Sequence, residues 1–221
     1  EKKNFLGTFA PPYAIINDSD FLNTLEQRDW ISGIAEAIKV ALIKDKDFFE
    51  YIETNAPKLR DREMQSMHYV IYRCAEMHMH HIAQGGDPFE SGSSRPLDFG
   101  HWAAHKMEQM SNYELRHGEA VAKGIALDVT YASLIGLISE EVVKRILNVM
   151  EQIGFDLQMP IENENELKTL LSGIQEFQEH LGGELCITLI SEIGAKHDVN
   201  KIDFEIMKKA VAHLNKLSQL T

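Results

Sequence analysis

Cysteine is nearly absent from this sequence. Its 221 residues include two cysteines, Cys74 and Cys186, which lie far apart within apolar stretches. A disulfide framework is therefore excluded, and we expect both side chains to be small buried groups in a reducing compartment. Long hydrophobic runs are also lacking, because none approaches the roughly 18–20 residues of a membrane span, and no signal peptide opens the chain. We therefore expect a cytoplasmic protein without a membrane partner.

Positive charge is in deficit as well. The chain carries 22 lysines and arginines against 34 aspartates and glutamates, which gives a formal net charge of −12. Surfaces that bind nucleic acid are rich in lysine and arginine, so a nucleic-acid partner is not expected. The hydrophobic fraction of 44% and the charged fraction of 25% are instead typical of a folded chain with a substantial core.

The hydrophobic pattern predicts a mainly α-helical fold. From residue 18 onward, apolar residues recur at the spacing of helices that bury one face. Ser139 is a suitable N-cap and Gly154 a suitable C-terminal stop for one of these helices. Residues 84–97, dense in glycine, serine and proline, predict a loop, and residues 184–190 predict a short strand. The expected helices cover about 18–25, 29–44, 61–83, 99–110, 117–135, 139–154, 164–171, 174–181 and 203–217.

The first 17 residues differ from the rest. Glycine and proline mark residues 3–12 as a loop, and the β-type run Tyr13–Ile16 predicts a short strand after it. The chain begins at Glu1 without methionine, so we expect a fragment from which preceding sequence has been removed. Residues 1–17 are then a loop and strand remnant, and residues 18–221 form the helical domain.

Three histidines form the strongest local signal for chemistry. His101 and His105 are four residues apart, so a helix places both on one face. His117 follows at the start of the next expected helix. If an antiparallel helix pair brings the three side chains together, they make a credible metal site. The alternative is a pair of histidines on a helix surface, in a chain that has ten histidines.

Glu36 and Lys39 form a second signal. Both lie away from the apolar stripe of the helix expected at 29–44. One interpretation is a solvated ion pair at i,i+3. The other is a carboxylate ligand beside an anion-binding lysine, both facing a cleft. A third run, Glu76 to His81, contains three histidines at irregular spacing, and we expect it to face solvent rather than bind metal.

Taken in order, these pieces resemble 3-dehydroquinate synthase and the wider sugar-phosphate cyclase family. The matching motifs agree in order and spacing along nearly the whole chain, and several motifs in register are more specific than any one of them. They are 3–7 (KNFLG), 20–25 (DFLNTL), 32–39 (SGIAEAIK), 98–101 (DFGH) with His105, and 117–122 (HGEAVA).

The resemblance implies a division of labour and a set of cofactors. In the family, an N-terminal α/β domain binds NAD, and a helical C-terminal domain carries zinc and much of the substrate site. This chain resembles the second part, so residues 1–17 would link it to a missing NAD-binding domain. The expected cofactors are NAD and zinc, with cobalt or another divalent metal as alternatives. The expected partners are a phosphorylated sugar and a second copy of the protein in a homodimer.

The resemblance also implies roles for individual residues. The family's zinc ligands fall on Glu36, His101 and His117, and this set leaves a position open for substrate. The positions that hold the phosphate and assist its departure fall on Lys39, His105 and Asn4, with Asp98 beside them. The positions that touch NAD fall on Lys3, Phe21, Leu22, Asn23 and Thr24.

The implied reaction is a series of steps of the carbon–oxygen lyase class, in which NAD is reduced and then oxidised again. A substrate hydroxyl is oxidised, phosphate is eliminated, the ketone is reduced again, and an intramolecular aldol step closes the carbocycle. The fragment by itself is expected to bind about one metal ion and to turn nothing over.

The sequence departs from dehydroquinate synthase where the substrate carboxylate binds. The family uses a lysine and an arginine, but here His78 stands nearest the lysine position, and Ser94 fills the arginine position with Arg95 one place further on. Asp98 and a histidine near His180 resemble 2-epi-5-epi-valiolone synthases instead, which cyclise a sugar phosphate that lacks the carboxylate. His78, Arg95 and His180 are therefore candidate substrate-binding residues.

Two further interpretations stay open. Iron-dependent alcohol and polyol dehydrogenases share the general architecture, but they typically place a histidine four residues after an aspartate ligand, and Val40 occupies that place after Glu36. The non-enzyme alternative is a helical metal-binding module that has lost catalysis.

Overall fold

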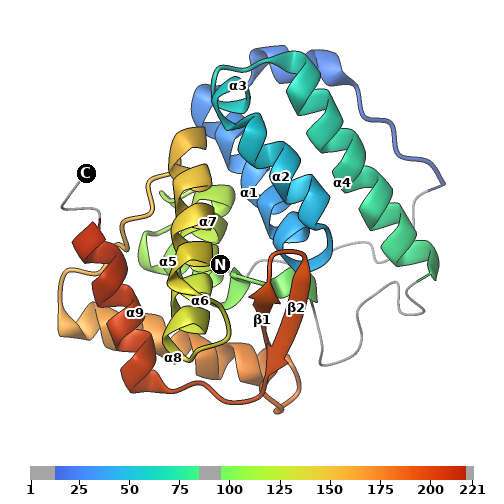
Figure 1. Ribbon diagram of the computed structural model, residues 1–221. Helices are drawn as coiled ribbons and strands as arrows, with labels where there is room; N and C mark the ends of the chain where they lie inside the picture. Colours follow the sequence, from blue (N-terminus) through green and yellow to red (C-terminus); the bar gives the residue numbers. More distant parts are fainter. Residues whose placement is uncertain (1–12, 85–95, 218–221) are drawn as a thin grey trace.

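The structure, a computed structural model, describes residues 13–84 and 96–217. Within these residues it has nine α-helices, two short 3₁₀ helices and one two-stranded antiparallel sheet, so the predicted mainly α-helical fold is confirmed (Figure 1). The elements are η1 (Ser19–Thr24), α1 (Gln27–Lys44), α2 (Lys46–Thr54), α3 (Ala56–Arg60), α4 (Met64–Gln84), η2 (Pro96–Asp98), α5 (His101–Met110), α6 (His117–Leu134), α7 (Glu140–Ile153), α8 (Glu164–His180), β1 (Ile187–Glu192), β2 (Ala195–Val199) and α9 (Phe204–Leu217).

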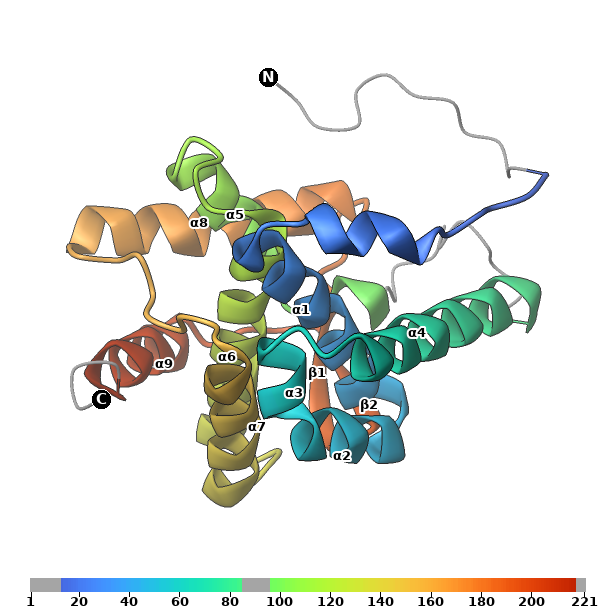
Figure 2. The same ribbon diagram turned by 90° about the horizontal axis from the view of Figure 1, so that it is seen from above.

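Helix α6 is the centre of the molecule. It packs against α1, α5, α7, α9 and β1, and nearly every side chain from Gly118 to Ala132 is buried. A helix whose residues are mostly apolar around its whole circumference has to be covered on all sides, which is why the other elements surround it. Helix α4 lies at the edge instead, and one end projects away from the other helices (Figure 2).

Local signals set several helix ends as expected. The Ser139 side chain accepts a hydrogen bond from the backbone N–H of Val142 at the start of α7, and Gly154 ends that helix in the left-handed conformation. The Asp18 side chain caps η1 by accepting from the N–H of Asp20.

Both cysteines are free thiols: Cys186 is buried and Cys74 partly buried.

Two predictions about strands need correction. The short strand expected at Tyr13–Ile16 is not formed, because a strand needs a hydrogen-bonding neighbour and, among the described residues, β1 and β2 pair only with each other. The strand expected at 184–190 exists as β1, shifted to Ile187–Glu192. It has a partner that the pattern did not indicate, β2, with Leu189 opposite His197.

One prediction about helices also needs correction, and two helices were not predicted. Residues 164–181 were expected to form two helices on either side of Gly173, but α8 is continuous. A side chain at Gly173 would lie 3.0 Å from Cβ of Lys106, so the glycine permits close packing of α8 on α5 rather than a break. Helices α2 and α3 were not predicted, since each is too short to show a clear period.

Candidate metal centre

Glu36, His101 and His117 come together from three separate helices. Glu36 lies on α1, His101 is the first residue of α5, and His117 is the first residue of α6. Their potential ligand atoms lie within 4.8 Å of one another. Oε1 of Glu36 is 3.5 Å from Nε2 of His101 and 3.6 Å from Nε2 of His117. The arrangement predicted from the motifs is therefore present as a geometric cluster.

The crossing of α1 and α6 brings Glu36 to His117. Gly118, next to His117, lies directly against the backbone of Ser32, and a Cβ there would be 2.0 Å from the Ser32 carbonyl oxygen. Only glycine allows the two helices to approach this closely. Ser32 is one helical turn before Glu36, so the contact places the carboxylate beside the histidine.

A second close crossing places His101. A Cβ on Gly124 of α6 would lie 2.0 Å from the carbonyl oxygen of Gly100, the residue that precedes α5 with a φ of +77°. Asp128, also on α6, accepts hydrogen bonds from the backbone N–H of Gly100 at 3.0 Å and from Nε1 of Trp102 at 2.9 Å. The residues on both sides of His101 are thereby tied to α6.

The chemistry of the donor set fits a divalent metal ion. Oε1 of Glu36 is buried and has no hydrogen-bond partner among the described residues, an arrangement that is costly for a carboxylate oxygen unless a cation meets it. Nδ1 of His101 lies 3.0 Å from the carbonyl oxygen of Phe99. A carbonyl accepts only, so that nitrogen carries the proton and Nε2 keeps its lone pair. Two imidazole nitrogens and one carboxylate are a common catalytic ligand set for zinc.

Glu36 is held ionised by its neighbours, Lys39 among them. The Lys39 ammonium group lies 2.5 Å from Oε2 of Glu36, so the i,i+3 ion pair considered from the sequence does form. Lys39 is only 5% exposed, so the pair is partly buried rather than fully solvated. Burial raises the pKa of Glu36, but polar contacts from His101 and His117 and the charge of Lys39 outweigh it. The net pKa is well below the ordinary value for a glutamate.

His105 lies next to the cluster on its exposed side. Its ring centroid is 5.5 Å from that of His101 and 5.9 Å from that of His117. It belongs to a second group of potential ligands, His105, Glu108 and His117, that are also mutually close. His117 is common to both groups.

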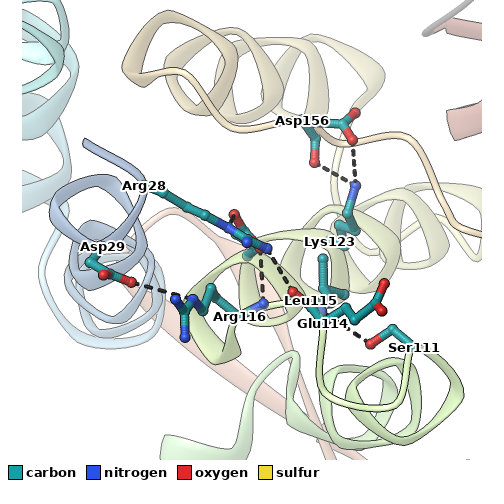
Figure 3. A network of polar contacts seen from close by, with 9 residues as sticks. Arg28, Asp29, Ser111, Glu114, Leu115, Arg116, Lys123 and Asp156 are labelled. Carbon is teal, nitrogen blue, oxygen red and sulfur yellow. Dashed lines mark hydrogen bonds and ion pairs between the residues drawn. The ribbon is translucent and has the colours of Figure 1, made fainter. Parts of the chain in front are cut away.

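A polar network holds the start of α6 in place (Figure 3). The Arg28 guanidinium on α1 donates to both carboxylate oxygens of Glu119 and, at 2.8 Å, to the carbonyl oxygen of Glu114. The Glu119 carboxylate in turn accepts a hydrogen bond from the backbone N–H of Arg116, the N-cap residue of α6. The network joins α1 to the turn before His117, the second tie between the helices that carry Glu36 and His117.

Several predicted site residues lie outside the cluster. His78 is exposed on α4, and Phe21, Leu22, Asn23 and Thr24 form part of η1, where Phe21 is 73% exposed. Asp98 ends η2, three residues before His101. His180 ends α8, and its side chain is outside the described set. Lys3, Asn4 and Arg95 lie outside the described residues.

Sequence reasoning missed Glu108. Its carboxylate is buried, and Oε2 lies 3.1 Å from Nδ1 of His117. A signal was available, because Glu108 is three residues after His105 and seven after His101 and therefore lies on the same face of α5.

Comparisons with known proteins show which family the chain matches. The family model described as 3-dehydroquinate synthase C-terminal matches residues 33–176. The 3-dehydroquinate synthase of Shewanella sp. (strain MR-4) is 33% identical over 193 residues, 87% of this chain and 53% of that protein. That of Thermodesulfovibrio yellowstonii is 31% identical over 92% of this chain and 55% of its own length. The chain thus spans about half the length of the curated relatives it matches.

Solved structures share the fold. A 2-epi-5-epi-valiolone synthase from Streptomyces hygroscopicus subsp. jinggangensis 5008, with NAD+ and Zn2+ bound, matches with a TM-score of 0.88 and 28% identity, over 97% of this chain and 59% of that one. A 2-deoxy-scyllo-inosose synthase complexed with carbaglucose-6-phosphate, NAD+ and Co2+ matches with a TM-score of 0.76 over 96% of this chain and 59% of that one. Its identity is 20%, so this second match shows the fold alone.

Proposed function

Because this chain belongs to the 3-dehydroquinate synthase C-terminal family, we propose that it is the metal- and substrate-binding part of an NAD- and zinc-dependent sugar-phosphate cyclase. The observation that carries the proposal is the convergence of Glu36, His101 and His117, with one buried carboxylate oxygen facing two imidazole nitrogens. In this proposal, residues 1–17 connect the helical domain to a nucleotide-binding domain, and the whole protein acts as a homodimer.

The proposed metal is zinc, held by Glu36, His101 and His117. The valiolone synthase relative was solved with Zn2+ and NAD+ bound, and three protein ligands leave a position for substrate. When bound, the metal supplies a Lewis acid that acidifies a substrate hydroxyl, and NAD supplies a reversible hydride acceptor. Lys3 and the η1 residues Phe21, Leu22, Asn23 and Thr24 are the residues proposed to touch NAD.

The residues around the ligands suit a phosphorylated substrate. Lys39 is a buried cation one turn from Glu36, and His105 adds an imidazole on the exposed side of the cluster. We assign these two residues, with Asn4 and Asp98, to binding the phosphate and assisting its departure. A positioned imidazole can give or take the proton that such an elimination requires, and a lysine stabilises the leaving dianion.

The test distinguishes the two possible substrates. The full-length protein is assayed with NAD and zinc against two substrates, the carboxylated heptulosonate phosphate of dehydroquinate synthase and sedoheptulose 7-phosphate. We expect phosphate release from one of them that requires both NAD and metal and is lost in His101→Ala. Release from the carboxylated substrate assigns dehydroquinate synthase activity; release from sedoheptulose 7-phosphate assigns the valiolone synthase-like branch.

Other outcomes contradict the proposal. Net accumulation of NADH with simple alcohols indicates an iron-dependent dehydrogenase instead. Metal binding without phosphate release from either substrate favours a metal-binding module without catalysis. His78→Ala is the matched control for His101→Ala as regards metal content, because His78 is exposed and lies outside the cluster.

A further inference from the structure

Glu108 is a buried acid that no proposed ligand or substrate role uses. It is 7% exposed, lies on α5 and has Oε2 3.1 Å from Nδ1 of His117. A carboxylate buried to this extent needs a partner with a proton to donate. The ring nitrogen of His117 is that partner.

This contact determines which nitrogen of His117 is available to a metal. A neutral imidazole carries one proton, and an ionised carboxylate can only accept. With the proton on Nδ1 and directed at Glu108, Nε2 keeps its lone pair and faces Oε1 of Glu36 at 3.6 Å. His101 has the same arrangement through the Phe99 carbonyl oxygen, so both histidines present Nε2 to one point.

The backbone around Glu108 is itself fixed. Its carbonyl oxygen accepts from the N–H of Tyr113 at 2.7 Å and from Oγ of Ser111 at 3.1 Å. Asn112 and Tyr113 have positive φ values, 51° and 63°, which turn the chain tightly toward α6. The hydroxyl of Ser111 also accepts from the N–H of Leu115, so one short turn holds Glu108 and His117 at a set distance.

We propose that Glu108 is a positioning residue that fixes the tautomer and ring orientation of His117 for metal binding. The proposal rests on the proposed metal site at Glu36, His101 and His117. Carboxylate partners of this kind orient ligand histidines, and their removal typically weakens metal binding by about 10–100-fold.

The competing role for Glu108 is that of a ligand together with His105 and His117, whose potential ligand atoms also lie close to it. That arrangement would take Nδ1 of His117 away from Glu108 as a proton donor. It would also leave Oε1 of Glu36 buried with no partner among the described residues. In the positioning role, Glu108 accepts the Nδ1 proton of His117 and the cation meets Oε1 of Glu36, so both carboxylates have a partner.

The test measures metal affinity of the full-length protein without reference to activity. Zn2+ is titrated in competition with a chromophoric chelator, and the absorption spectrum of the Co2+-loaded protein is recorded. The variants are Glu108→Ala, Glu108→Gln, Glu36→Ala and His117→Ala. Glu53→Gln is the matched control, because Glu53 is a partly buried acid paired with Arg145 on helices away from the cluster. Circular dichroism of each metal-free variant verifies folding.

We expect Glu108→Ala to weaken zinc binding by about 10–100-fold with the Co2+ band shape retained. Glu108→Gln should recover most of the loss, because its amide oxygen still accepts from Nδ1. If Glu108→Ala leaves the zinc affinity unchanged while Glu36→Ala lowers it, the positioning role of Glu108 is overturned and the proposed metal site is not. Loss in Glu108→Ala as complete as in His117→Ala, without rescue by Glu108→Gln, makes Glu108 a ligand and also overturns it. Wild-type affinity in Glu36→Ala overturns the proposed metal site itself.

Discussion

Two regions of this molecule are rich in histidine, and only one of them forms a candidate site. Helix α4 carries His78, His80 and His81 within four residues, whereas His101 and His117 are sixteen residues apart on α5 and α6. His78 and His80 are exposed, and within residues 13–84 and 96–217 none of the α4 histidines belongs to a group of three potential ligands. Density of histidine in the sequence is therefore a poor guide to where a metal binds.

The two regions differ in the hydrogen-bond partners of the imidazole rings and in the packing of the helices that carry them. His101 and His117 each have an acceptor at Nδ1, from Phe99 and Glu108, and each begins a helix that crosses another at a glycine. The α4 histidines lie on an edge helix with solvent on one side. A metal site needs ligands held in place before the ion arrives, and only closely packed elements do that.

The largest expected effect separates the two regions directly. His101→Ala should weaken zinc binding by more than about 100-fold, because it removes a metal ligand. Removing a residue that only hydrogen-bonds to a ligand already weakens metal binding by about 10–100-fold. The double variant His78→Ala/His80→Ala should bind within about twofold of wild type. Competition with a chromophoric chelator measures both. Equal losses in the two variants would show that the α4 histidines bind metal.

The next effect concerns the helix crossing. Gly118→Ala should destabilise the fold by about 3 kcal/mol, since the new Cβ would meet the Ser32 carbonyl oxygen at 2.0 Å and overpacking of this kind costs 1–3 kcal/mol or more. Gly33→Ala on α1 is the control, because nothing lies within 4 Å of its Cβ. It should stabilise by about 0.5–1 kcal/mol through helix propensity. Urea unfolding of both variants tests the pair, and tolerance of Gly118→Ala would contradict the crossing.

A third effect is expected at Asp128, and it depends on pH. Burial raises the pKa of this carboxyl to about 7, although hydrogen bonds from Trp102 and Gly100 oppose the rise. Because the folded pKa exceeds the unfolded value of about 3.9, the stability contribution is present at low pH and is lost as the pH rises through 7.

The measurement for Asp128 compares wild type with Asp128→Asn in chelator-treated protein. The stability advantage of wild type over the variant should fall by on the order of 2 kcal/mol between pH 5 and pH 8. Titrations of the other histidines and acids are common to both proteins and cancel in the difference. A difference that is constant with pH would show that Asp128 does not titrate in this range.

The smallest effect is again on α4. His80→Ala alone should change the free energy of unfolding by less than about 0.5 kcal/mol, as is usual for a surface position without special contacts. His80 is exposed, so little packing is lost. Thermal unfolding beside wild type measures the change, and a loss of 1 kcal/mol or more would mean that α4 is covered in the intact protein.

Much of the helical architecture was predictable because its cause is local. The apolar stripe of α1, the serine and glycine that bound α7 and the amphipathic pattern of α9 all depend on residues within a few turns of each other. Where the predictions were wrong, the deciding contact was distant. The break expected between residues 171 and 174 is not formed, because Gly173 lets the continuous α8 pack closely on α5, and the run Tyr13–Ile16 has no described strand to pair with.

The sequence by itself determined that this chain is mainly helical, that its motifs belong to one family and which residue types could bind a metal. Those properties follow from periodicity, capping and motif order along the chain. Only the tertiary structure decided that Glu36, His101 and His117 converge, that Glu108 contacts His117 and Asp128 binds the backbone beside His101, and that the α4 histidines stand apart. The physical reason is that convergence depends on how helices cross. The crossings here are set by close contacts of Gly118 and Gly124 with residues far away in the chain.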